Sequence, residues 1–151
     1  MDITIRPARQ EDQDMIVSYV RQAKINPRNL HWQNFFVAED NGKVVGIRQI
    51  KVYPQGTREA ASGFVLPEYR RRGISAQLMN ALLAREKGPV YAMVNQKRVP
   101  YYEQFGFRQV DPVQLPADFH REYRMGRMRT TLMSLFAKER IRIVPLKRDP
   151  A

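Results

Sequence analysis

The sequence predicts a single α+β domain. Its 151 residues fall within the usual size of one domain, and 43 % of them are hydrophobic, which is enough to build a core. Stretches with strand-like alternation and stretches with helical spacing follow one another in the order β-α-β-β-β-α-β-α-β-α-β. No repeat, linker or low-complexity segment interrupts that order. Residues 59–94 read as a strand–helix–strand unit, which we expect to be a right-handed parallel crossover.

The first half of the chain contains four predicted strands and one helix. Ile3 and Ile5 alternate with polar neighbours, as in a half-buried strand. The helix that follows carries acidic residues near its start, where they complement the helix dipole. Asn41-Gly42 suits the tight turn of a hairpin. The predicted elements here are a strand at 2–8, a helix at 9–24, hairpin strands at 34–39 and 43–53, and a strand at 57–66.

The second half alternates helices with strands. Ile74, Leu78 and Leu82 share one face of a helix that Gly88 is expected to end. Pro100 suits the first turn of a short helix, and Gly106 suits its end. The predicted elements are a helix at 74–88, a strand at 89–95, a short helix at 99–107, a strand running into a loop at 108–116, a helix at 117–139 and a strand at 140–148.

Composition restricts the chemistry. The net charge is +11, with a pI near 10.3, so the chain should attract polyanions such as nucleic acid, phosphorylated cofactors or acidic surfaces. Because there is no cysteine, a disulfide framework and a thiol nucleophile are excluded. Only two histidines occur and no carboxylates cluster suitably, so no metal site is predicted. Without a membrane-length apolar run or a signal-like start, we expect a cytoplasmic protein with no membrane partner.

The segment VLPEYRRRGISAQLMNALL, residues 65–83, combines three arginines, a glycine and the start of a helix. A helix N-terminus presents free backbone N–H groups and a partial positive charge. Gly73 permits unusual backbone angles and close approach of a ligand. This arrangement suits a phosphate or pyrophosphate, although a solvated basic loop before an ordinary helix fits the same residues. The spacing matches neither a P-loop nor the three-glycine dinucleotide fingerprint.

Three segments resemble the GNAT acetyltransferase superfamily. In its acetyl-coenzyme A pattern, Gln/Arg-x-x-Gly-x-Gly/Ala, Arg70, Gly73 and Ser75 occupy the marked places, with Ser75 departing from Gly or Ala. NQKRVPYYEQFGF, residues 95–107, resembles a later motif, Asn … Tyr-Glu-x-x-Gly-Phe, but has Arg98 where many members have Ala. REAASGFVLPEYRRRGIS resembles the sequence of one subgroup of the family, which reads Glu-Leu-Ala-Ser-x-x-Val-x-Pro-x-Tyr-Arg before the glycine. The resemblance spans residues 1–110 and is strongest over 59–107.

The resemblance implies a fold and a cosubstrate. The expected fold is a single GNAT-like domain over residues 1–151, with a mixed, mostly antiparallel central sheet flanked by helices and a parallel strand–helix–strand cofactor unit. Backbone N–H groups of the arginine loop would hold the pyrophosphate of acetyl-CoA, and the preceding strand would pair with the pantetheine arm. One arginine side chain reaches the 3′-phosphate, or all stay in water. The residues implied are Phe64, Val65, Leu66, Arg70, Arg71, Arg72, Gly73, Ile74, Ser75 and Asn95.

The resemblance also implies an acyltransferase that moves the acetyl group directly to an amine, without a covalent enzyme intermediate. Tyr102 is the candidate acid for the departing thiolate, and a tyrosine packed beneath the cofactor is the alternative. Its neighbour Tyr101 is expected to point into the core. Glu59 is the candidate base, with His31 as its rival and an ordinary edge-strand glutamate as the alternative. A strand N–H near Phe64 or Val65 would polarise the carbonyl.

The acceptor is less defined by the sequence. The subgroup that the chain resembles acts on small amines or amino acids, and a protein acceptor or a GNAT-like module that binds RNA or an acidic protein are the alternatives, nucleic acid being the less favoured partner. Basic residues are frequent after residue 120, but Met128 follows Arg121 and Arg124 on their helix face, so no strict basic stripe forms. A solvated helix surface is the favoured interpretation. A homodimer through the last helix and strand stays open.

Overall fold

The computed structural model describes residues 1–151. Its strands and α-helices follow one another in the predicted order. The seven strands are hydrogen-bonded in the order β1-β2-β3-β4-β5-β7-β6. The chain forms two compact units, one made of residues 1–51 and 60–86 and the other of residues 52–59 and 87–151.

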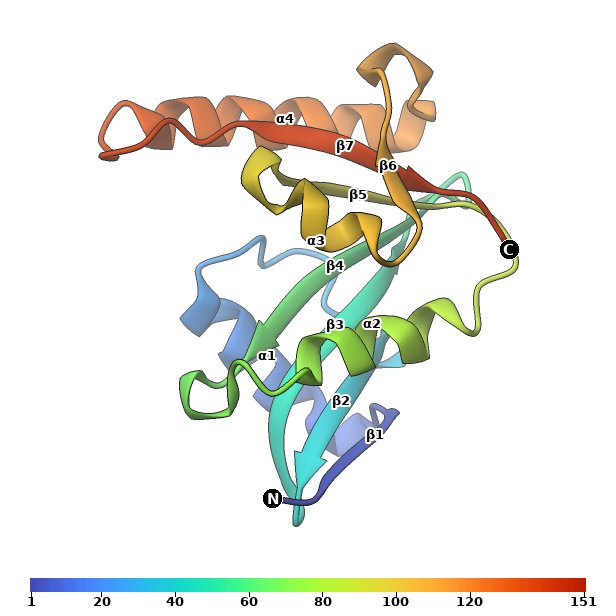
Figure 1. The fold of residues 1–151 in the computed structure, drawn as a ribbon, viewed down its shortest axis with the longest axis vertical. Coiled ribbons are helices and arrows are strands. Elements are labelled where there is room, and N and C mark those ends of the chain that lie inside the picture. Colours follow the sequence, from blue (N-terminus) through green and yellow to red (C-terminus); the bar gives the residue numbers. More distant parts are fainter. The chain divides into compact units, whose positions relative to one another are not determined.

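The first unit holds the antiparallel strands of the N-terminal half. β1 pairs with β2 and β2 with β3, both antiparallel. Asn41 and Gly42 have φ angles of 48° and 85°, so both adopt the left-handed conformation that the hairpin turn requires. Figure 1 shows α1 and α2 on opposite sides of these strands. The elements that contribute to this unit are β1 (Ile3–Pro7), α1 (Gln13–Ala23), β2 (Phe35–Asp40), β3 (Lys43–Val52), β4 (Arg58–Val65) and α2 (Ile74–Leu83).

A half-buried ion cluster ties β1 to the start of α1 within this unit. The Arg6 guanidinium donates to both carboxylate oxygens of Asp12, at 2.8 and 3.1 Å, and to Glu39 at 2.8 Å. The backbone N–H of Arg9 donates to Asp12 at 2.7 Å. Burial alone would raise the pKa of Asp12, but the hydrogen bonds from Arg6 and Arg9 outweigh it, so this pKa lies below its ordinary value. The hydrogen bond from Arg6 also lowers the pKa of Glu39.

The second unit contains the rest of the sheet. β4 and β5 pair in parallel, with Glu59 opposite Tyr91, as the predicted crossover requires. β7 lies between β5 and β6 and is antiparallel to both. A cluster of buried side chains forms its core: Tyr53, Tyr91, Leu115, Phe119 and Tyr123. The elements added here are β5 (Val90–Asn95), α3 (Val99–Glu103), β6 (Phe107–Gln109), α4 (Ala117–Ser134) and β7 (Ile143–Arg148).

The α+β class, the mixed sheet and the parallel unit are confirmed. Several helix ends differ from the prediction: α1 begins at Gln13, α3 ends at Glu103, and α2 and α4 also end early. α2 ends at Leu83 rather than near Gly88, because the next turn tightens: the N–H groups of Arg85 and Glu86 donate to carbonyls three residues back. α4 ends at Ser134, whose hydroxyl accepts the N–H of Ile141 at 2.9 Å as the chain turns back. One domain over residues 1–151 stays a prediction.

None of the helices combines the length and the apolar character that crossing a membrane requires. The structure brings no three His, Asp or Glu side chains together in an arrangement that could hold a metal ion.

Candidate cofactor-binding and catalytic site

The loop between β4 and α2 takes a backbone course that few residues favour. The N–H of Leu66 still donates to Val45 O at 2.9 Å, so the strand pairing continues past β4. A single turn of 3₁₀ helix follows over Pro67–Tyr69. Arg71 and Gly73 then have φ angles of 63° and 77°. A Cβ at Gly73 would meet no atom within 4 Å, so glycine is favoured there by its backbone angle and not by crowding.

Gly73 is the N-cap of α2, and no side chain caps this helix end. The first intrahelical bond runs from the N–H of Gln77 to Gly73 O, at 3.0 Å. The N–H groups of the first turn, from Ile74 to Ala76, therefore have no acceptor within the helix. Together with the helix dipole they form a positively polarised end that suits an anion. The predicted residues from Phe64 to Leu66 and from Arg70 to Ser75 all contribute to this one strand–loop–helix segment.

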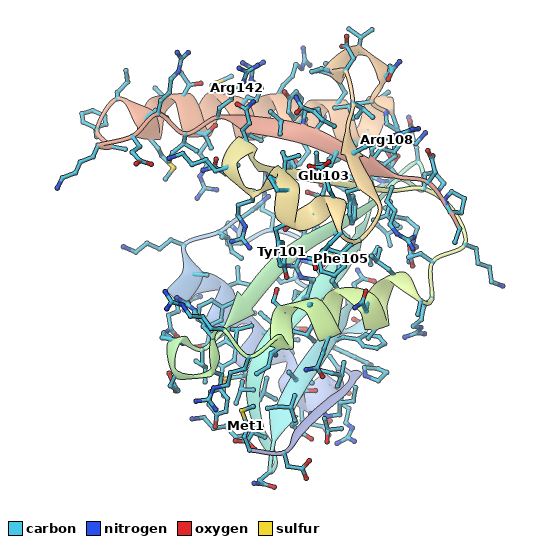
Figure 2. All side chains as sticks on the ribbon, viewed as in Figure 1. Met1, Tyr101, Glu103, Phe105, Arg108 and Arg142 are labelled. Atoms are coloured by element: carbon cyan, nitrogen blue, oxygen red, sulfur yellow. The ribbon has the colours of Figure 1, made fainter.

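The three arginines of the loop differ in what their side chains do. Arg70 folds back on the strand, donating from Nε to Val65 O at 2.9 Å, with its guanidinium 5.6 Å from the Phe64 ring centre. The Arg72 guanidinium lies 5.7 Å from the Tyr69 ring centre and 3.0 Å from the sulfur of Met1, which Figure 2 labels. Arg71 is exposed and makes no such contact. All three arginines are exposed, and Arg71 is the one whose side chain makes no such contact with its own unit.

Sequence reasoning missed Arg48 on β3. Its side chain is 5 % exposed, and Nη2 lies 3.4 Å from the hydroxyl of Ser75 in the first turn of α2. A Cβ at Gly63 would come within 2.4 Å of Nη2, so the glycine leaves the space that the guanidinium fills. A buried cation therefore lies next to the start of α2. The signal was present, because an arginine within the apolar run VVGIRQI needs a reason to be buried.

Glu59 lies at the start of β4 in the second unit and is 3 % exposed. The Tyr53 hydroxyl donates to Glu59 Oε1 at 2.6 Å. Tyr53 in turn packs edge-on against Phe119, with ring centres 5.6 Å apart. The carboxylate is thus held in a fixed position beside the aromatic core cluster, unlike that of an ordinary solvated edge-strand glutamate. The rival base, His31, is exposed in the first unit.

Tyr102 is the buried member of the tyrosine pair on α3. It is 8 % exposed, and its ring packs edge-on against Phe107 at 5.7 Å. Tyr101 is only half-buried and packs against Phe105 at 5.3 Å; both are labelled in Figure 2. The expectation that Tyr101 is the core residue was wrong. On this short helix, Tyr102 packs against Phe107 of β6. The Arg98 guanidinium lies over the Tyr101 ring, 5.3 Å from the centre of that ring.

Asn95 ends β5 and caps the turn that leads into α3. Its Oδ1 accepts the N–H of Lys97 at 3.1 Å, and its backbone lies opposite Ile143 of β7. The side chain therefore fixes the short 3₁₀ turn Gln96–Arg98, which positions α3 and its two tyrosines.

Comparisons with known proteins agree with this geometry. A family model described as an acetyltransferase (GNAT) domain matches residues 31–109, and no curated protein matches the sequence. N-acetylglutamate synthase from Neisseria gonorrhoeae, complexed with coenzyme A and N-acetyl-glutamate, is similar in structure with a TM-score of 0.77 at 18 % identity. The match covers 100 % of this chain but 36 % of the synthase, so the chain spans about a third of that protein.

Two other similar structures match along nearly their whole length. Rv2747 from Mycobacterium tuberculosis, in complex with CoA and NLQ, has a TM-score of 0.72 at 21 % identity, covering 98 % of this chain and 99 % of that one. A GNAT-family acetyltransferase from Staphylococcus aureus Mu50 has a TM-score of 0.67 at 15 % identity, covering 98 % and 99 %. The family model covers more than half of the sequence, and the fold and the parallel β4–β5 pair agree with it. The chain belongs to the GNAT acetyltransferase family.

Proposed function

We propose that the protein is an N-acetyltransferase that moves the acetyl group of acetyl-CoA directly to a primary amine of a small molecule or amino acid. The observation that carries the proposal is the left-handed loop that opens α2 in a chain of the GNAT family. No side chain caps its first turn, and a Cβ at Gly73 would meet no atom within 4 Å. These are the features that a pyrophosphate needs.

The residues of this segment fit coenzyme A as the cosubstrate. Backbone N–H groups from Arg71 to Ser75 would hold the pyrophosphate. The backbone of Phe64, Val65 and Leu66 would align the pantetheine arm along β4. Arg70 donates to Val65 O, and Arg72 lies over the ring of Tyr69. Arg71 makes no such contact, so it is our candidate for binding the 3′-phosphate. Asn95 supports the site indirectly in this proposal, through the turn that it caps.

Acetyl transfer needs a base for the amine and a donor for the departing thiolate. The amine nitrogen attacks the thioester carbonyl, the C–S bond breaks, the amine loses a proton and the sulfur gains one. Glu59 is our candidate base, acting through water, and Tyr102 our candidate donor to the sulfur. Direct transfer needs no covalent enzyme intermediate, and the chain has no cysteine on which an acyl-enzyme thioester could form. His31 stays the rival base, and Glu59→Gln and His31→Gln distinguish the two by which variant loses the acidic limb of the pH–rate profile, where protonation of the base lowers the rate.

Two observations favour an amino acid as the acceptor. The similar synthase structure contains N-acetyl-glutamate, an acetylated amino acid. The net charge of +11 attracts carboxylates and disfavours polyamines, which are themselves cationic. The second candidate is transfer to a protein, or a binding role toward an acidic protein or RNA, and the basic residues after residue 120 favour it.

Calorimetry of acetyl-CoA with the purified chain tests the proposal. The parent should bind, and Gly73→Glu should abolish binding, because a side chain and a negative charge would occupy the pyrophosphate position. Gly56→Glu is the matched control: Gly56 also has a positive φ, 92°, and open surroundings, but lies in the turn after β3. It should bind as the parent does. A folded parent that does not bind acetyl-CoA would overturn the enzyme proposal.

An assay of thiol release over a panel of amines then separates the acceptors. Amino acids, a polyamine and a peptide with a free amino terminus cover the three classes. Turnover with an amino acid supports the proposal. Turnover with the peptide alone moves the assignment to the protein acceptor, and acetyl-CoA binding without turnover on any amine favours the binding role.

A further inference from the structure

Helix α4 is apolar on two faces. On the inner face, Phe119 and Tyr123 are buried in the core cluster of the second unit. Gly126 continues this face, since a Cβ there would lie 3.2 Å from the sulfur of Met93 on β5. Figure 1 shows the helix running alongside β7. One face of α4 is therefore fully used in folding.

A second set of apolar residues lies on the outer face of the same helix. We call the four residues Met125, Met128, Leu132 and Leu135 the outer stripe. They are 42 %, 66 %, 59 % and 72 % exposed, in that order. Leu135 is the C-cap and keeps helical angles, so the stripe runs to the end of the helix. Large apolar side chains this exposed are common singly, but a contiguous row of them marks an interaction site.

The spacing of the outer stripe is that of a helix–helix seam. Its members are separated by three, four and three residues, the a/d pattern of a heptad repeat. At about 100° per residue they fall within roughly 80° of the helix circumference, on the side opposite Phe119. A strip this narrow matches the contact line of a second helix. Met133 and Phe136, 50 % and 92 % exposed, lie outside this strip.

The charges beside the stripe select the partner. Arg121, Arg124 and Arg129 are exposed on the outer side of α4. Glu122, half-buried near the start of the helix, is the acid beside them, and no acidic residue occurs between Tyr123 and Lys138. The next acid, Glu139, is paired with Lys97. Two copies of this helix would bring arginines against arginines, which destabilises a self-paired seam. A partner helix with acidic residues beside its apolar row would satisfy every one of them.

We propose that the outer stripe docks an acidic amphipathic helix of another protein. The apolar rows of the two helices interdigitate, and carboxylates on the partner pair with the arginines on either side. Methionine suits such a surface, because its flexible thioether adapts to varied partners. This inference does not depend on acetyl transfer.

Fluorescence anisotropy with designed peptides tests it on the full chain. The probe is a labelled helical peptide of about three heptads, with Leu at positions a and d and Glu at e and g. One control peptide has Lys at e and g, and a second keeps the Glu residues but has Gln at a and d. At about 0.15 M salt, which screens generic charge attraction, the probe should bind about tenfold or more tightly than either control.

Paired protein variants separate apolar docking from charge. Met128→Gln with Leu132→Gln keeps the charge and should weaken probe binding about tenfold or more, since both side chains are exposed and their loss should not unfold the chain. Arg124→Glu with Arg129→Glu should shift the preference to the Lys peptide. Circular dichroism checks that both variants fold.

Three results would overturn the proposal. Equal binding of the Gln control peptide would reduce the effect to charge. A parent dimer in sedimentation that the Met128→Gln, Leu132→Gln variant loses would assign the stripe to a second copy of the chain. Pelleting of the parent, but not of that variant, with phosphatidylserine vesicles would assign it to a lipid surface.

Discussion

Arg70, Arg71 and Arg72 share one chemistry but not one role. Two of them are held against their own unit, by Val65 O and by the ring of Tyr69. Arg71 has a left-handed backbone, with a φ of 63°, and its exposed side chain makes neither kind of contact. At the scale of the residue, local contacts therefore distinguish three identical side chains, two held by neighbouring groups and one without such a contact.

Arg71→Ala should weaken coenzyme A binding about tenfold, because a charge-assisted hydrogen bond to a phosphate contributes about 1.5–3 kcal/mol. Dephospho-coenzyme A, which lacks the 3′-phosphate, should bind the parent and the variant equally. Arg72→Ala is the control and should change neither affinity. Calorimetry with the two ligands checks this, and an equal loss with both would show that Arg71 acts elsewhere.

Tyr102→Phe should lower kcat by about a hundredfold while changing acetyl-CoA affinity little, since general acid catalysis contributes about 10²–10⁴-fold. The ring and its packing against Phe107 are kept, so the fold should not suffer. Tyr101→Phe removes a neighbouring phenol and should be nearly silent. Steady-state thiol release over a range of pH is the measurement. Full turnover by Tyr102→Phe at every pH would leave Tyr102 a packing residue only.

At the scale of the element, α4 has one buried face that stabilises the fold and another face that is exposed. Phe119 is fully buried against Tyr53 and Tyr91, whereas Phe136, just beyond the helix, is 92 % exposed. The same residue type thus occurs at both extremes of burial within one segment. The Asp118 carboxylate also holds the turn after β3, accepting the N–H of Gln55 at 3.0 Å.

Phe119→Ala should lower the free energy of unfolding by about 3–5 kcal/mol, because it leaves a cavity in the aromatic cluster. Phe136→Ala makes the same change in side-chain volume without a cavity and should stay within about 0.5 kcal/mol of the parent. Urea unfolding of both variants is the measurement. Similar losses for the two would mean that the end of α4 is packed in solution.

The strands and helices were more predictable from the sequence than the way they pair and pack in space. Alternation, helical spacing and the Asn41-Gly42 turn are local signals, and they placed every strand and helix in order. The insertion of β7 between β5 and β6 depends on long-range pairing, which no local signal encodes. Likewise, Gly73 was predictable because it has a local reason. Arg48 beside Ser75 was not, because only the tertiary contact between β3 and α2 brings the two together.

At the scale of the whole molecule, electrostatics limits the acid range in which the protein is stable. The hydrogen bonds from Arg6 and Arg9 hold the pKa of Asp12 below its ordinary value against the effect of burial. A carboxyl whose pKa is lower in the folded state than in the unfolded state contributes stability above its unfolded pKa, about 3.9. That contribution is lost as the pH falls through the folded-state pKa.

The free energy of unfolding should therefore fall as the pH drops below about 4. Asp12→Asn should be less stable than the parent at pH 7, by about 1–3 kcal/mol, because it weakens the bonds to Arg6 and Arg9. It should also show a shallower loss below pH 4, since it has one fewer proton to take up on unfolding. Thermal unfolding between about pH 2 and pH 7 measures both effects. If the parent and Asp12→Asn lost stability equally as the pH fell, Asp12 would not be the cause of the acid sensitivity.

The contact between Gly126 and Met93 links two positions that are distant in sequence. Glycine within a helix costs about 1 kcal/mol relative to alanine, and α4 accepts that cost because a Cβ would lie 3.2 Å from the sulfur of Met93. A change at one position therefore alters which residues the other accepts. Among divergent descendants of this chain, alanine at position 126 should be inherited together with a shorter side chain at position 93, so that the two sites evolve as a pair.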